Sequence, residues 1–77
     1  MGLPYIDMIA TGENINHLRK ASGLSIKNIQ TEMGFSTPNA VYKWIHGETL
    51  PTIDNLLILS RLLNVTMDRI IVQERKG

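Results

Sequence analysis

Apolar residues recur every three or four positions through most of the chain, which is the period of an amphipathic helix. No period-two alternation and no internal repeat stands out, so the pattern predicts an all-α fold. Five helices are expected, with their inward-facing residues in parentheses: residues 11–22 (Ile15, Leu18, Ala21), 25–33 (Ile29, Met33), 37–46 (Val41, Trp44, Ile45), 52–63 (Ile53, Leu56, Leu57, Ser60, Leu63) and 67–72.

Short polar residues and glycines mark the expected ends of these helices. Hydroxyl side chains suit the first position of a helix because they accept hydrogen bonds from its unpaired amides, and a left-handed residue suits the last. The expected N-terminal caps are Thr11 (with Gly12 as the alternative start), Ser25, Ser36 or Thr37, Thr52 and Thr66, and the expected stops are Gly23, Gly34, Gly47 and Asn64.

The two ends of the chain differ in character from the helices. Residues 1–10 form an apolar arm in which Pro4 argues against a helix at the start. An arm this apolar should lie against something, either the core of its own domain or a second subunit. Residues 73–77 form a polar tail that is expected to fray. The predicted organisation is therefore one domain at residues 11–72 between an arm and a tail.

Residues 25–47 stand out as a unit. They form a short helix, a tight turn at residues 33–36, and a second short helix with an apolar inner face and a small, polar outer face. This pattern is typical of a helix-turn-helix, in which the second helix enters the major groove of DNA.

Composition and charge narrow the class of protein. The chain has 77 residues, no cysteine and a net charge of +1, so one small domain without disulfides is expected. The basic residues gather in the helix-turn-helix region: residues 13–47 carry a net +2, and residues 48–68 a net −2. No membrane span and no secretory signal is apparent, and we expect a cytoplasmic protein.

Catalysis and metal binding find no support in the sequence. The chain contains no glycine-rich phosphate loop and no nucleophile elbow. His17 and His46 are its only histidines, and without cysteine they do not make a metal site. We therefore expect no enzyme, no cofactor, no metal and no small-molecule ligand.

The order of these signals resembles the Cro/C1-type helix-turn-helix family, also called the xenobiotic-response-element family of bacterial and phage repressors. The matching stretches are ENINHLRKASGLS, IQTEMGFS and AVYKWIHGETLPTIDNLLILSRLLNVTMDRII, from about residue 12 to residue 72. The resemblance implies a compact five-helix, lambda-repressor-like domain with the helix-turn-helix at helices 2 and 3. It also implies binding to operator DNA, commonly as a dimer on a palindromic site.

Three positions depart from the family pattern. Ile26 stands where the family often has a phosphate-binding glutamine, so Lys27 is expected to substitute. Ile45 stands where the family often has a glutamate that pairs with a basic residue such as Arg19, and Arg19 is expected to be free for solvent or phosphate. The turn before the third helix is one residue longer than the commonest family turn.

The candidate contact residues follow from the inward direction of Val41 and Trp44, which turns their helical neighbours outward. The base-facing candidates are Thr37, Asn39, Ala40 and Lys43, and the phosphate-contacting candidates are Ser25, Lys27, Tyr42, His46 and Thr49. Asn39 can bond adenine at two points, and Lys43 can reach guanine acceptors. Alternatively, Thr37 only caps its helix, Lys43 is a solvated lysine, and Tyr42 lies flat on a neighbouring side chain.

The expected function is sequence-specific binding of double-stranded DNA by a transcriptional regulator, a repressor in particular. The alternative is a protein-interaction module, such as an antitoxin or a phage-control partner, with little specific DNA binding. Three features support that alternative: the low net charge, Ile26, and the excess of apolar residues in the arm and in the fourth helix, which is apolar nearly all round. A homodimer is expected, with an interface formed by Ile58, Leu59, Leu62, Ile70 and Ile71 unless the arm covers these residues.

Overall fold

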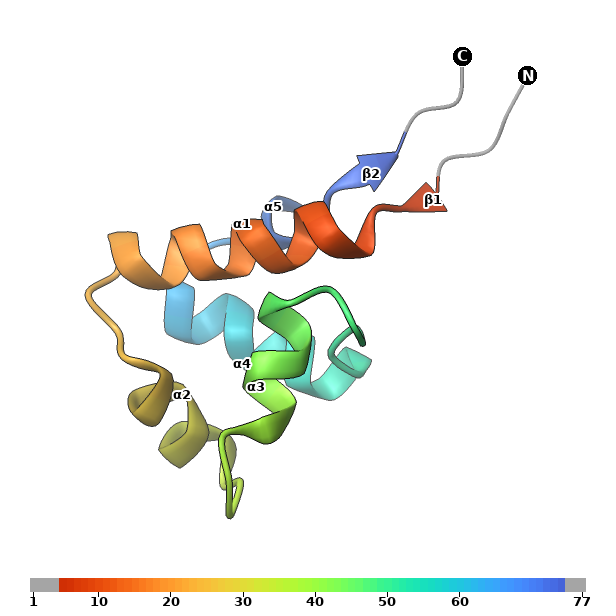
Figure 1. The fold of residues 1–77 in the computed structure, drawn as a ribbon. Helices are drawn as coiled ribbons and strands as arrows, with labels where there is room; N and C mark the ends of the chain where they lie inside the picture. The colour runs from red at the N-terminus through yellow and green to blue at the C-terminus, as the bar shows by residue number, and fades with distance from the viewer. Residues whose placement is uncertain (1–4, 75–77) are drawn as a thin grey trace.

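The computed structural model of the chain describes residues 5–74. Five helices pack together, and a very short strand lies at each end of the described chain (Figure 1). In chain order the elements are β1 (Tyr5–Ile6), α1 (Met8–Ala21), α2 (Ile26–Met33), α3 (Asn39–Ile45), α4 (Ile53–Leu63), α5 (Met67–Ile70) and β2 (Gln73–Glu74). The five-helix architecture confirms the all-α prediction, whereas the strands were not expected.

Helix α1 begins earlier than predicted. Its first residue is Met8 instead of Thr11 or Gly12. The carboxylate of Asp7 caps it by accepting a hydrogen bond of 2.9 Å from the amide of Ala10. An acidic cap satisfies an unpaired amide and suits the positive end of the helix. The arm is therefore shorter than expected, because its last three residues belong to α1.

The predicted ends of the middle helices are largely confirmed. Ser25 caps α2, and Gly34 (φ 73°) and Asn64 (φ 56°) end α2 and α4 in the left-handed conformation. Thr52 precedes α4 as expected, but its hydroxyl donates to the carboxylate of Asp54 and caps no amide. Helix α4 therefore begins with an acidic side chain held at its positive end.

One continuous core lies between the helices. Its buried apolar residues are Ile15, Ile29, Val41, Trp44, Leu56, Leu59, Leu63 and Ile70. Leu59 and Ile70 have no exposed surface, so their assignment to a dimer interface is wrong. Leu62 and Ile71 are half-buried, and Ile58 is 38% exposed.

Helix α4 buries Leu56, Ser60 and Leu63 as predicted, but its buried face is shifted around the axis. Ile53 is 81% exposed and Leu57 is 45% exposed, whereas both were expected in the core. Leu59 takes the inner position instead, together with Leu56 and Leu63. Ala21, at the end of α1, is also exposed instead of buried.

The two ends of the described chain lie side by side (Figure 1). Strands β1 and β2 pair antiparallel, with Tyr5 opposite Glu74 and Ile6 opposite Gln73. The pairing continues into a 2.8 Å hydrogen bond from the amide of Asp7 to the carbonyl of Val72. The first two tail residues are thus paired instead of frayed, and this part of the arm lies against its own chain. Residues 1–4 and 75–77 of the arm and tail lie outside the described residues.

Polar side chains of α1 hold the C-terminal segment in place. The Thr11 side chain is buried, and its hydroxyl accepts a 2.9 Å hydrogen bond from the amide of Val72. The side-chain nitrogen Nδ2 of Asn14 donates to the backbone carbonyls of Arg69 (2.7 Å) and Ile70 (2.9 Å). These bonds satisfy backbone groups at the end of α5 that have no partner within so short a helix.

Candidate nucleic-acid interface

Helix α2 is anchored at its start by a reciprocal pair of hydrogen bonds. The hydroxyl of Ser25 accepts from the amide of Asn28, and the side chain of Asn28 accepts from the amide of Ser25, both at 2.9 Å. This capping box satisfies two amides at the positive end of the helix. Ser25 and Lys27 are exposed there, beside the half-buried Ile26. At the start of α2, the Ser25 hydroxyl and the Lys27 ammonium group are thus presented to solvent.

Arg19 is engaged and is not free, contrary to the prediction. Its guanidinium donates to the side-chain oxygen of Asn16 at 3.0 and 2.8 Å, and to the carbonyl of Leu24 at 2.8 Å. Leu24 immediately precedes the Ser25 cap, so this bond joins the last turn of α1 to the start of α2. The side chain fixes the entry into α2 in place of the ion pair that Ile45 cannot make.

The turn between α2 and α3 is held by a residue that the sequence did not single out. Gln30 is buried, and its side-chain amide donates to the carbonyl of Phe35 at 3.2 Å, while its own carbonyl accepts from the Phe35 amide at 3.0 Å. The ring of Phe35 meets Trp44 edge to face, with 5.8 Å between centroids. Phe35 therefore fills the angle between the two helices. A glutamine next to the inward-facing Ile29 was the available signal for Gln30.

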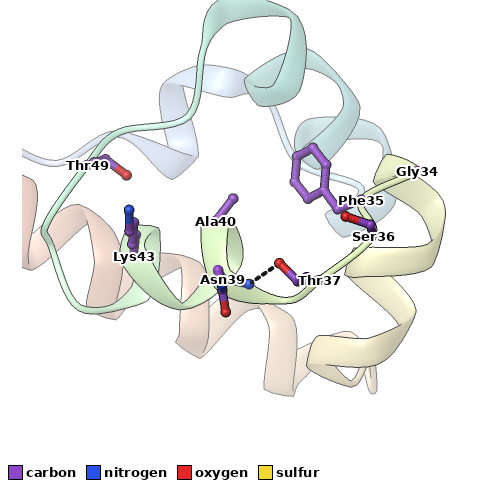
Figure 2. A pocket seen from close by; sticks show the side chains of 8 residues that line it. All are labelled: Gly34, Phe35, Ser36, Thr37, Asn39, Ala40, Lys43 and Thr49. Atoms are coloured by element: carbon purple, nitrogen blue, oxygen red, sulfur yellow. Dashed lines mark hydrogen bonds between the residues drawn. The ribbon is translucent and has the colours of Figure 1, made fainter.

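Helix α3 begins later than predicted. Its first residue is Asn39, and Pro38 occupies the cap position without a side-chain hydrogen bond. Neither Ser36 nor Thr37 is the cap. The Thr37 hydroxyl instead accepts a 3.3 Å hydrogen bond from the amide of Asn39, which Figure 2 shows as a dashed line. The lengthened turn therefore ends in a local bend that orders the first residue of the helix.

All four base-facing candidates line one open hollow of about 660 Å³. Figure 2 shows them along the outer side of α3 and the preceding turn, with Thr49 at the opposite edge. The complete lining is Gly34, Phe35, Ser36, Thr37, Asn39, Ala40, Lys43 and Thr49. Thr37, Asn39 and Lys43 are exposed, whereas Ala40 is half-buried against the core. One surface thus holds an amide, an ammonium group, hydroxyls and a methyl, which are the groups that read base edges.

The phosphate-contacting candidates are divided among three places. Thr49 belongs to the hollow, whereas Ser25 and Lys27 lie at the start of α2 and outside its lining. The rings of Tyr42 and His46 stack with centroids 6.1 Å apart, so Tyr42 does lie flat on a neighbour. Tyr42 is nevertheless 45% exposed.

His46 has an acidic neighbour within the loop that follows α3. Its Nδ1 lies 3.9 Å from the carboxylate of Glu48, and both side chains are more than half exposed. The carboxylate places negative charge beside the imidazole and weakens attraction of a phosphate at this point. Among residues 5–74 no group of three or more histidine, cysteine, aspartate or glutamate side chains could hold a metal ion. Within the same range, every helix is too short or too polar to cross a membrane.

Comparisons with known proteins agree on this architecture. A family model described as helix-turn-helix matches residues 15–70. The structure is similar to the crystal structure of the restriction-modification controller protein C.AhdI from Aeromonas hydrophila, with a TM-score of 0.74 and 23% sequence identity. The similarity covers 83% of this chain and 96% of that one, and at this identity it shows a shared fold. Among curated proteins no sequence matches.

Proposed function

The chain belongs to the helix-turn-helix family, and from this premise we propose that it is a sequence-specific DNA-binding transcription regulator that acts as a repressor. Helix α3 enters the major groove, and the start of α2 lies on the phosphate backbone. The fold neighbour is itself named a controller protein, which supports a regulatory role. Repression is the simplest outcome of this binding mode, because a helix-turn-helix domain that occupies its operator excludes other proteins from the same stretch of DNA.

One observation carries the proposal: the side chains that can read bases share a single exposed surface. Val41 and Trp44 are buried under α3, and this directs Asn39 and Lys43 away from the core and into the open hollow. The hollow is too open to enclose a small molecule, but a duplex edge covers such a surface. Its polar groups then meet base edges in the groove.

The contacts divide into reading and positioning. Asn39 donates and accepts at adenine, Lys43 donates to guanine acceptors, and Ala40 or the Thr37 methyl meets a thymine methyl. Ser25 and Lys27 hold a phosphate at the positive end of α2, and Tyr42, His46 and Thr49 contact the backbone beyond α3. The Arg19 and Gln30 hydrogen bonds fix the angle between the helices, and thus the register of both sets of contacts.

We also propose that the protein binds as a homodimer on a palindromic site. One helix of seven residues offers few base contacts, and two half-sites about one helical turn apart double them. The exposed apolar residues of α4 supply a surface on which two copies can meet.

The proposal is tested by selecting bound sequences from a random duplex pool with the purified protein. We expect an enriched palindromic motif, bound by the wild type with an affinity that falls steeply as salt is raised. The Asn39→Ala and Lys43→Ala variants should lose preference for that motif while keeping the wild-type circular dichroism spectrum. Recovery of no motif would overturn the proposal and favour the protein-interaction alternative. A motif that both variants still select would show that α3 is not the reader.

A further inference from the structure

The outward face of α4 has a pattern that is complementary to itself. Its buried residues, among them Leu56 and Leu59, lie on one side of the helix, and Asp54 and Arg61 are exposed on the other. Asp54 and Arg61 are seven residues apart, so they lie about 20° from each other around the axis and about 10 Å apart along it. The two opposite charges therefore mark the two ends of one line along the helix.

The middle of this line is apolar. Leu57 and Ile58 lie halfway between the charges, at about 50° on either side of the line. They are 45% and 38% exposed. A rotation by half a turn about an axis through this midpoint exchanges the acidic end for the basic end and leaves the apolar centre in place.

Neither charge has an ionic partner among the residues that the structure describes. Among residues 5–74, His46 and Glu48 form an ion pair, and neither of them belongs to α4. Asp54 accepts a hydrogen bond from the neutral hydroxyl of Thr52, which keeps its carboxylate at the start of the helix. Both charged groups are thus available to a surface that approaches α4.

We propose that a second copy of this chain docks on this face, with the two α4 helices antiparallel around a twofold axis. Leu57 and Ile58 of each copy meet at the centre, and Asp54 of each copy faces Arg61 of the other. The interface is isologous, so each contact occurs twice. This interface gives a geometry to the homodimer of the proposed function and rests on that function. Its contacts come from exposed residues and not from the buried Leu59 and Ile70.

The available surface suits such a contact. A specific interface removes about 500 Å² or more from each partner, which is roughly a tenth of the 5301 Å² surface of the described chain. Ile53, at 81% exposure, and Met67, at 37%, extend the apolar area beside the central pair. None of these residues lines the hollow at α3, so docking leaves the DNA-reading surface open.

Charge reversal tests the geometry. The variants are Asp54→Arg, Arg61→Asp and the double variant, and sedimentation velocity measures their self-association. Asp68→Arg is the matched control, because Asp68 is also exposed in the first turn of a helix but belongs to α5. Circular dichroism checks that each variant is folded.

We expect the wild type and the control to dimerise equally, and each single variant to have a dimer dissociation constant raised about tenfold or more, since like charges then meet twice. Mixing the two single variants should restore dimers, and so should the double variant, because each again pairs opposite charges. Wild-type monomers at every concentration would overturn the inference, as would single variants that associate like the wild type or mixtures that stay monomeric. Wild-type monomers that still select a DNA motif would leave the proposed DNA-binding function standing without this interface.

Discussion

Gly12 in α1 lies directly against the backbone carbonyl of Trp44 at the end of α3. A Cβ atom at this glycine would collide with the carbonyl oxygens of Trp44 and Ile45. Both oxygens belong to the backbone and cannot rotate away. The close approach of α1 to α3 at this point therefore depends on the absence of a side chain at residue 12.

The Gly12→Ala variant should be less stable despite the higher helix propensity of alanine. Overpacking against backbone forces the helices apart, and we expect a loss of about 1–3 kcal/mol in the free energy of unfolding. Urea denaturation followed by circular dichroism measures the loss. Glu13→Ala, at the exposed neighbouring position, is the control and should change stability little. Equal stability of Gly12→Ala and the wild type would show that α1 can shift away from α3 at no cost.

The hydrogen bonds of Gln30 should contribute to stability, because they hold the turn that sets the angle between α2 and α3. Gln30→Leu removes the donor to the Phe35 carbonyl and should cost about 1–3 kcal/mol, because a poorly solvated acceptor loses its partner. Gln30→Glu should cost more at neutral pH, because a carboxylate then faces that carbonyl. Urea denaturation ranks the three proteins. Equal stability of the leucine and glutamate variants would contradict the role given to this hydrogen bond.

The sequence predicted the helices and most of the core for a physical reason. Residues such as Ile15, Val41 and Trp44 recur at helical spacing against polar neighbours, so only one face could be buried. Helix α4 is apolar nearly all round, and there the period cannot choose between Leu57 and Leu59. The strands have two residues each, which is too short for any periodic signal.

The outward-facing side chains of the candidate site could be predicted from the sequence, whereas the side chains that hold its helices in place could not. Asn39 and Lys43 could be placed because the inward residues of the same short helix fix their direction. Arg19 and Gln30 donate to the backbone carbonyls of Leu24 and Phe35. A carbonyl is present at every residue, so no sequence pattern indicates which one a side chain will reach.

Asp54 should make the stability of α4 depend on pH. The hydrogen bond from the Thr52 hydroxyl, with backbone amides adding to it, holds the pKa of the Asp54 carboxyl below its ordinary value of 3.8. A lowered pKa in the folded state contributes stability that is present above the ordinary value and is lost as pH falls through the lowered one. The wild type should therefore exceed Asp54→Asn in stability at neutral pH, and the difference should vanish in acid.

Urea denaturation of the two proteins at both pH values, in dilute solution, measures this difference. The carboxylate is fully exposed, so the difference should also shrink as salt is added. A difference that persisted unchanged in acid would mean that the charge of Asp54 is not its source.

Replacing Asn39 or Lys27 by alanine should change DNA binding in different ways. Asn39 lines the hollow on α3, and Lys27 is exposed at the start of α2 beside the Ser25 cap. An amide that bonds a base carries sequence information, whereas an ammonium group that meets a phosphate carries only attraction. Asn39→Ala should therefore reduce the preference for the selected motif by about 1–3 kcal/mol at one base position.

Lys27→Ala should weaken binding to all duplexes alike and lower the slope of log affinity against log salt by about one per binding site. Titrations of both variants against the selected motif, a single-base variant of it and an unrelated duplex, at several salt concentrations, separate the two effects. Lys20, exposed at the end of α1, provides a matched lysine control, and Lys20→Ala should leave specificity unchanged. If Lys27→Ala altered base preference and Asn39→Ala altered only the salt slope, the assignment of α3 to bases and α2 to phosphate would be reversed.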